Sequence, residues 1–385
     1  MVFSQETLER NQLFEDVFTG KIPKRVPRNP IFQIEMVLEH CGFSLHKEQF
    51  SLSKQVEALH KFNTEVDTDS VAGVAIRWPQ IYKMLGSINF QMGTDGFLQH
   101  PDVAGMEVED YDALITDPYK TLVDIIIPRI HKELALDKSS AGIAKAKAFF
   151  AYLNAFQTIG MANNEIAMQY GKSTIPSFAG ITEAPYDFLA DQLRSFSGTS
   201  KDIRRIPEKV GAACETLTPL LRKMGSPKGS NGTKFDQIFI PLHMAPYMRE
   251  KDFAKYYWPT FKKLCEGLSE NGYGIYLFVE HDWSRFVDYL HDLPEGTHMA
   301  IEYGDPKVFK DKLGSKHILS GFYPVNILKT GTKEECVYKA KELLDILAPG
   351  GNYIFDYDKV VLRANDVNIE NVNAVNKAVK EYGVY

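Results

Sequence analysis

Between Ile238 and Gly321 the sequence alternates strand-like and helix-like segments, and the strand-like segments end in polar residues. The runs IFIPLH, GIYLFVEHDW and HMAIEYGDP end at or just after His243, Glu280 and Glu302, and a fourth run, HILSGFYP, follows directly. Strands and helices that alternate at this spacing predict parallel βα units. In a (β/α)8 barrel the carboxyl ends of the strands meet at one mouth, where the chemistry takes place. We therefore expect these polar side chains to lie close together.

The rest of the chain fits one α/β domain over residues 1–385, a (β/α)8 barrel of the TIM type with an N-terminal helical extension. The run QETLERNQLFEDVF after Ser4 predicts the extension, and PIFQIEM (30–36) predicts the first strand. Residues 74–118 form a long irregular stretch. Loops of that length are uncommon unless they are functional, so this stretch is a candidate rim or lid.

Composition narrows the class of protein. A net charge of −6 argues against nucleic acid as the main partner. No apolar run reaches the length of a membrane span, and the charged N-terminal sequence lacks a signal-peptide core, so we expect a cytoplasmic protein without a membrane partner. The four cysteines are scattered and predict free thiols rather than a disulfide framework. The apolar outer helices fit a homodimer, and equally a monomer.

Acids, histidines and tyrosines at strand ends allow acid–base chemistry, metal binding or both. Glu280 directly follows five apolar residues, which favours a functional role over a surface role. His243 is either a core histidine or a functional one, and Glu302 resembles Glu280. Tyr323 lies at the mouth end of its strand, where it could bind a substrate oxygen. Asp69 could serve the site or an Asx turn.

Several segments of the sequence resemble those of a known family. The segments PLHMAPYM, FAKYYWPTFKKLCEGLSENGYGIYLFVEHDW, LPEGTHMAIEYGDPKVFKDKLGSKHILSGFYPVNILKTGTKEE and DVNIENVNAVNKAVKEYG are similar to the uroporphyrinogen decarboxylase superfamily, as are APYDFLADQLRSFSG and GKIPKRVPRNPIFQIE. The superfamily includes corrinoid-dependent methyltransferases beside the decarboxylases. The resemblance implies a (β/α)8 barrel, in agreement with the alternation of strands and helices.

The decarboxylase branch binds a polycarboxylate tetrapyrrole. The chain keeps Arg25 and Arg28 of an arginine-rich N-terminal segment, and Asp69 could match that branch's aspartate. Where that branch carries a histidine near its last strand, this chain has Asp356 and Asp358. Extra negative charge disfavours an anionic ligand, so the decarboxylase function is the less favoured alternative.

The methyltransferase branch, including O-demethylases, moves a methyl group to the cobalt of a separate corrinoid protein. Several members hold zinc with His-x-Cys and a distant Cys. Here the first element is His243-Met244-Ala245, and Ser320–Tyr323 lacks the distant cysteine. A thiolate-rich zinc site is thus excluded, while zinc held by histidine and carboxylates remains compatible with the ligand chemistry.

Taken together, the residues and the resemblance lead to a hypothesis with two alternatives. The protein would demethylate a small methylated compound, such as a methoxylated aromatic, and pass the methyl group to a corrinoid protein. His243, Glu280 and Glu302 would hold zinc or polarise the oxygen, with Asp69 and Tyr323 orienting the substrate. The alternatives are a uroporphyrinogen-type decarboxylase (a carboxy-lyase), and a non-catalytic tetrapyrrole- or corrinoid-binding module.

Overall fold

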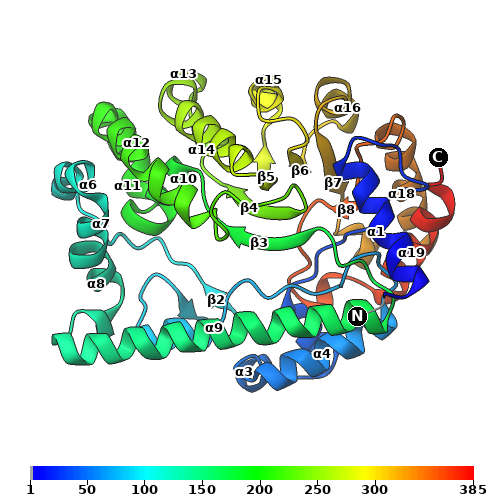
Figure 1. Ribbon diagram of the computed structural model, residues 1–385, viewed down its shortest axis with the longest axis horizontal. Coiled ribbons are helices and arrows are strands. Elements are labelled where there is room, and N and C mark those ends of the chain that lie inside the picture. The colour runs from blue at the N-terminus through cyan, green and yellow to red at the C-terminus, as the bar shows by residue number, and fades with distance from the viewer. Residues whose placement is uncertain (1–2) are drawn as a thin grey trace.

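The computed structural model describes residues 3–385. Its centre is a parallel sheet with the strand order β3-β4-β5-β6-β7-β8, curled around an axis (Figure 1). The strands are β3 (Ser177–Ile181), β4 (Asp236–Leu242), β5 (Gly274–Asp282), β6 (His298–Tyr303), β7 (Ile318–Tyr323) and β8 (Asp356–Tyr357). The strand runs predicted between residues 238 and 323 are thereby confirmed.

Two further extended segments close the ring between β8 and β3. Backbone contacts join four pairs of residues around this gap: Phe355–Arg28, Val361–Phe32, Gln33–Val74 and Asp69–Ser173. With these segments as the first and second staves, the chain forms the expected (β/α)8 barrel. The predicted first strand at 30–36 is partly wrong, since α2 (Ile34–His40) already begins inside it. A short apolar run does not distinguish a strand from a buried helical turn.

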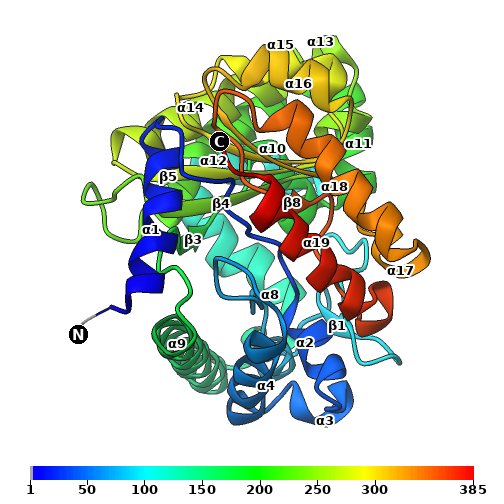
Figure 2. The ribbon, with the colours of Figure 1, turned by 90° about the vertical axis from the view of Figure 1, so that its right-hand side faces the viewer.

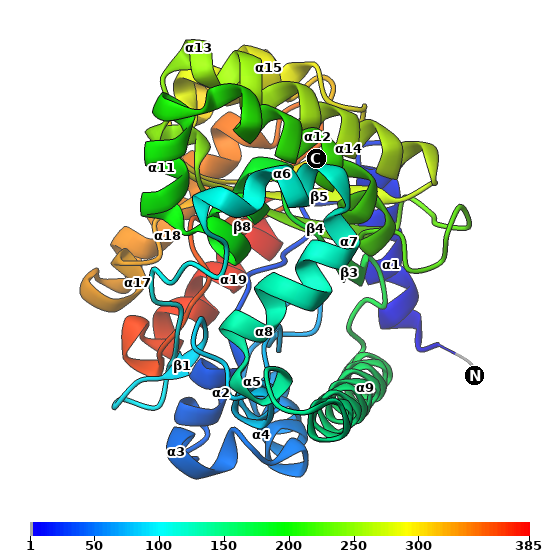
Figure 3. The ribbon, with the colours of Figure 1, turned by 90° about the vertical axis from the view of Figure 1, so that its left-hand side faces the viewer.

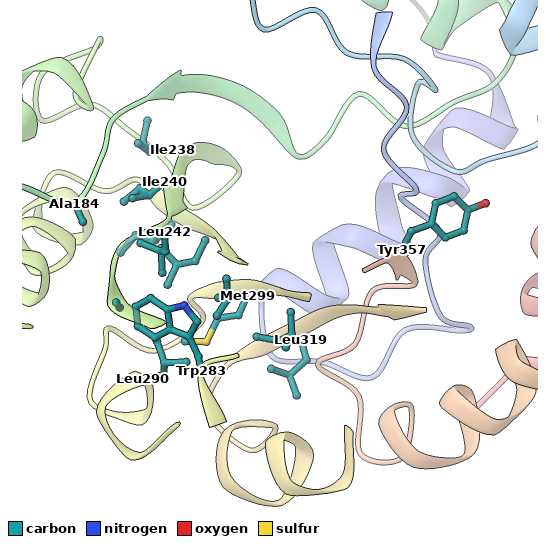
Figure 4. Close-up of a cluster of buried hydrophobic side chains, with 14 of the residues drawn as sticks. Ala184, Ile238, Ile240, Leu242, Trp283, Leu290, Met299, Leu319 and Tyr357 are labelled. Atoms are coloured by element: carbon teal, nitrogen blue, oxygen red, sulfur yellow. The ribbon is translucent and has the colours of Figure 1, made fainter. Parts of the chain in front are cut away.

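Helices surround the sheet on its outer side. They are α10 (Pro185–Phe188), α11 (Phe196–Arg205), α12 (Pro207–Met224), α13 (Glu250–Asp252), α14 (Trp258–Glu270), α15 (Val287–His291), α16 (Pro306–Leu313), α17 (Ile327–Thr330), α18 (Lys333–Leu347) and α19 (Ile369–Tyr382). Figure 4 shows the core between the sheet and these helices, where Leu242 of β4 lies near Trp283, and Ile240 and Ile238 follow farther along the strand. Because side chains alternate along a strand, Gln237, Phe239 and Pro241 face the barrel interior.

The N-terminal extension is the helix α1 (Gln5–Phe18), begun by the Ser4 side chain, which accepts a hydrogen bond from Thr7 N. Figure 2 shows α1 lying against one side of the barrel. Its apolar residues Phe14, Val17 and Phe18 cluster with Ile318, the first residue of β7. The extension therefore covers the amino-terminal end of the barrel and leaves the carboxyl ends of the strands free.

The remaining elements precede β3 in the sequence, and Figure 3 shows α3, α4, α5 and α9 on one side of the sheet, with α8, α7 and α6 leading from them to α12. They are α3 (Leu45–Glu48), α4 (Leu52–Glu65), α5 (Pro79–Leu85), β1 (Gln91–Met92), β2 (Leu98–Gln99), α6 (Tyr111–Thr116), α7 (Pro118–Thr121), α8 (Ile127–Ile130) and α9 (Lys138–Gln169). The stretch 74–118 thus contains short helices and a small hairpin. Within residues 3–385 no helix is both long and apolar enough to span a membrane.

Candidate active site

His243 lies directly after β4, on the inward-facing side of the strand. One nitrogen of its ring, Nδ1, hydrogen-bonds to the carboxylate of Asp191. The other, Nε2, lies 3.2 Å from Oε1 of Glu280, which comes from the end of β5. The side chains of His243 and Glu280 are 31% and 27% exposed, so the pair is accessible from the mouth. The sequence prediction that these two residues meet is supported by this geometry.

The residues after β3 position the ring from the other side. Asp187 of α10 accepts hydrogen bonds from the backbone N–H groups of His243 (3.2 Å) and Met244 (3.0 Å), and from the Tyr257 hydroxyl (2.7 Å). Asp191 lies one turn later in η4 (Leu189–Arg194), a wide π-helical turn. Such turns occur frequently at functional sites. The two aspartates fix both the backbone and the ring orientation of His243.

The electrostatics of this cluster favour a charged imidazole. Burial alone would lower the pKa of His243, but hydrogen bonds and charge from Asp191 and Glu280 raise it to about 11. The pKa of Asp187 is raised to about 7 by burial and by Asp191, against the opposing effect of His243. At neutral pH the site therefore holds an imidazolium between two carboxylates.

Glu183 is a further acid of the site and follows β3. Gln192 donates a hydrogen bond of 2.9 Å to its Oε1, while its Oε2 is buried without a hydrogen-bond partner. Burial, reinforced by the negative charge of Asp191, raises the pKa of Glu183 to about 8. Most of this carboxyl group is therefore protonated at neutral pH, a state in which it can donate a proton.

Glu302 is near the mouth but belongs to a different set of contacts. Its carboxylate accepts a hydrogen bond of 2.8 Å from the backbone N–H of His281 and pairs with Lys359 Nζ at 2.9 Å. Among residues 3–385, no group of three or more His, Cys, Asp or Glu side chains is placed to hold a metal ion. The expected zinc ligands His243, Glu280 and Glu302 thus do not come together as a set of three.

Two other predicted site residues lie elsewhere. Asp69 is fully buried where the first two staves begin, and its carboxylate binds Arg25 (2.7 Å) and Arg28 (2.9 Å). The hydroxyl of Tyr323 donates a hydrogen bond of 3.1 Å to the Cys336 carbonyl oxygen on α18, which places this side chain outside the barrel. The expectation that Asp69 and Tyr323 orient a substrate is therefore not supported by their positions.

The segment 74–118 contributes to the mouth, as expected for a rim. Burial lowers the pKa of His100, while the nearby Asp191 carboxylate acts in the opposite direction. Phe90 stacks on the His100 ring at 4.3 Å, and the Arg77 guanidinium lies 5.2 Å from the Phe90 ring centre. The two ends of the hairpin β1–β2 thus carry a pair of stacked rings beside the acidic site, and Arg77, which precedes α5, lies next to them.

A second aromatic group borders the site at the end of β5. A shallow cavity there is lined by Pro246, Tyr247, His281, Asp282, Ser284 and Arg285. The Tyr247 hydroxyl lies 3.0 Å from His281 Nε2, and the ring of Phe196 packs edge-on against Tyr247 at 5.2 Å. His281, which lines this cavity, directly follows Glu280 in β5.

Sequence reasoning missed Asp187, Asp191 and Glu183. All three acids lie in the run TEAPYDFLADQL, which follows β3. A usable signal was present, because Asp187 and Asp191 are four residues apart and share one face of a helix that directly follows a strand. Two carboxylates on the buried first turns of such a helix point at the barrel mouth.

Comparison with known proteins agrees with this architecture. The family model for Uroporphyrinogen decarboxylase (URO-D) matches residues 151–382, which run from within α9 to the end of α19. Among solved structures, the chain is similar to a methyltransferase from Methanosarcina mazei, with a TM-score of 0.64 and 13% sequence identity over 97% of this chain and 98% of that one. At this identity the likeness shows a shared fold. No curated protein sequence matches the chain.

Proposed function

The chain belongs to the uroporphyrinogen decarboxylase family, and from this premise we propose that it is a methyltransferase that demethylates a small methylated compound, such as a methoxylated aromatic. The methyl acceptor would be a reduced corrinoid carried by a separate protein. The similar fold of the methyltransferase from Methanosarcina mazei supports a methyltransferase function. The geometry that carries the proposal is the His243 imidazole, held by Asp191 on one nitrogen and facing Glu280 at 3.2 Å on the other.

The oxygen of a methyl ether is a poor leaving group unless it receives a proton. The site holds a group that can donate one. In the proposed reaction the bond between the methyl carbon and the oxygen breaks, and its electron pair stays on the oxygen. The acceptor supplies the electron pair for the new bond to carbon. A proton from Nε2 of His243 neutralises the oxygen, in a step of general acid catalysis that typically contributes roughly 100- to 10,000-fold.

The surrounding acids have distinct roles in this proposal. Asp191 keeps the ring in the orientation that presents Nε2 to the substrate, as carboxylates do for catalytic histidines. Glu280 holds the charged ring before the substrate oxygen takes its place beside Nε2. Glu183, with its pKa raised to about 8, would return the proton to His243 after product release. The aromatic rings of Tyr247 and Phe196 would bind an apolar ring at the rim.

The charge of the mouth weighs against the decarboxylase alternative. Asp191 and Glu280 flank the ring of His243, so two carboxylates stand against the single positive charge of the imidazolium. A polycarboxylate tetrapyrrole would meet these acids, which is unfavourable at close range. A small neutral ether carries no such penalty, so its binding fits the observed charges better.

The test is methyl transfer to reduced cobalamin, monitored by its absorbance, with purified protein and a panel of methoxylated aromatics and methylated amines and thiols. Formation of the demethylated product in step with methylation of the acceptor would support the proposal. In parallel, the protein is incubated with a porphyrinogen and carbon dioxide release is measured. Carbon dioxide release, or no transfer from any methylated donor, would overturn the proposal.

A further inference from the structure

Arg77 is a cation beside the acidic site whose guanidinium has no partner within the described chain. It precedes α5, which packs against α9 and β1 (Figure 3), and its side chain is exposed. Most other arginines of the chain form ion pairs with acids, as Arg25, Arg129 and Arg194 do. Arg77 forms neither an ion pair nor a hydrogen bond with any of residues 3–385. Because arginine keeps its charge at physiological pH, this cation is available to a ligand.

An aromatic stack positions the guanidinium without neutralising it. Arg77 Cζ lies 5.2 Å from the centre of the Phe90 ring. Phe90 is buried and packs against two further rings, His100 at 4.3 Å and Tyr82 at 4.5 Å between ring centres. The face of an aromatic ring attracts a cation but supplies no opposite charge. The stack of Tyr82, Phe90 and His100 therefore holds Arg77 in place and leaves its positive charge uncompensated.

The same stack borders the residues around His243. Burial lowers the pKa of His100, and the charges of Arg77 and His243 both lower it further. Burial raises the pKa of Tyr82, which Arg77 opposes and Glu183 reinforces. Because interactions between charges weaken with distance and with screening, these effects place the stack close both to Arg77 and to the reaction centre. A ligand beside the stack can therefore reach Arg77 and His243 together.

Glu35 is the acid on which the charge of Arg77 acts, but the two residues do not form an ion pair. Burial raises the pKa of Glu35, whereas Arg77 lowers it. The Oε2 atom of Glu35 is buried without a hydrogen-bond partner, so its carboxyl group is not satisfied by the guanidinium. Burial favours the neutral form of a carboxyl group. Glu35 thus leaves the donors of Arg77 free.

Opposite charges mark the two ends of this region. At one end Asp191 and Glu280 flank the His243 ring, which disfavours an anionic group there and suits a neutral ether. At the other end a guanidinium matches a carboxylate, which it can bind through two parallel hydrogen bonds. We propose that Arg77 binds a carboxylate of the substrate, so that the compound demethylated is a methoxylated aromatic acid. This inference rests on the proposed function and adds to it the residue that selects the substrate.

Isothermal titration calorimetry tests the proposal without any methyl transfer. The probes are 3-methoxybenzoate and its neutral amide, 3-methoxybenzamide, at pH 7, where the acid is ionised. The two share the ring and the ether, so the difference in Kd reports the carboxylate. Wild type is expected to bind the acid roughly 10- to 100-fold more tightly than the amide, the range for hydrogen bonds to a charged group. Arg77→Gln should remove this preference and leave the Kd of the amide nearly unchanged.

Two further variants serve as controls. Arg205 is also an exposed arginine without an ion pair, and it ends the outer helix α11, so Arg205→Gln should keep the full preference for the acid. Arg77→Lys should keep part of it, because lysine retains the charge but not the paired donors. Equal binding of acid and amide by wild type, no binding of either at millimolar concentration, or a preference that Arg77→Gln leaves intact would overturn the proposal.

The calorimetry separates this proposal from the proposed reaction. If the preference for the acid depends on Arg77 but no methyl group reaches reduced cobalamin, the carboxylate site stands and the proposed reaction fails. If methyl groups are transferred from the acid and the amide with equal kcat/KM, the reaction stands and the role of Arg77 is overturned.

Discussion

Replacing Asp191 by asparagine should shift the titration of His243 into a range that is easy to measure. The ordinary pKa of this residue is 6.5, and in the site it is raised to about 11, a rise of about 4.5. That rise corresponds to ~6 kcal/mol in favour of the charged ring. Burial disfavours the charged ring, so the carboxylates of Asp191 and Glu280 together must contribute at least ~6 kcal/mol to it.

The size of the expected change in the pKa of His243 depends on how much Asp191 contributes to raising it. If Asp191 and Glu280 contribute about equally, removing one carboxylate costs ~3 kcal/mol, which agrees with the usual strength of a hydrogen bond to a charged group. The pKa of His243 should then fall by roughly 2, to about 9. The pKa of Glu183 should fall as well, because the charge of Asp191 contributes to raising it.

The assay is a histidine titration by nuclear magnetic resonance from pH 5 to pH 11. The chain has ten histidines, and His243→Gln identifies the signal of interest by its disappearance. In wild type this signal should stay in its protonated position through pH 9, and in Asp191→Asn it should move with a midpoint near 9. A wild-type midpoint between pH 6 and 7 would refute the reasoning.

The pH dependence of stability independently checks the direction of the pKa shift of His243. A histidine whose pKa is raised on folding stabilises the native state most at pH values below its ordinary pKa. That contribution falls as the pH rises from 6.5 toward 11, where the folded protein also loses the proton. The free energy of unfolding of wild type should therefore decrease between pH 7 and pH 10 relative to His243→Gln.

Three further predictions follow from the other predicted site residues. Asp69→Asn should cost about 3–5 kcal/mol of unfolding free energy in urea, because it leaves the buried Arg25 and Arg28 poorly compensated; an unchanged urea midpoint would contradict this. Tyr323→Phe should cost only about 1 kcal/mol, the value of its hydrogen bond to Cys336, and a tenfold loss of methyl transfer would argue against its placement outside the barrel. Dialysis against a chelator should leave the rate unchanged, since among residues 3–385 no three donors converge, and activity that zinc restores would reverse that view.

The barrel could be predicted because its second half has regular strands and helices. From β4 to β7 each strand is a short apolar run with a polar end, and His243 and Glu280 were correctly expected to meet. The first two staves were harder, because near Gln33 and Val74 the chain makes only isolated backbone bridges. Segments so short leave no periodic pattern that separates them from loops.

The site was less predictable than the fold. In a parallel barrel both faces of a strand are buried, so hydrophobicity did not show that Tyr323 faces α18 while Ser320 faces inward, where it bonds His298. Glu302 has the same position on β6 as Glu280 on β5, but Lys359 from the loop after β8 neutralises it. Such pairing depends on segments that are distant in the sequence.

The most direct test of the central claim is a single-turnover measurement of methyl transfer in wild type, His243→Gln and His60→Gln. His60 is a half-buried histidine of α4 outside the site, so it serves as the matched control. We predict that His60→Gln transfers methyl at the wild-type rate and that His243→Gln is slower by roughly 100-fold or more. Equal rates for wild type and His243→Gln would contradict the assignment of His243 as the proton donor.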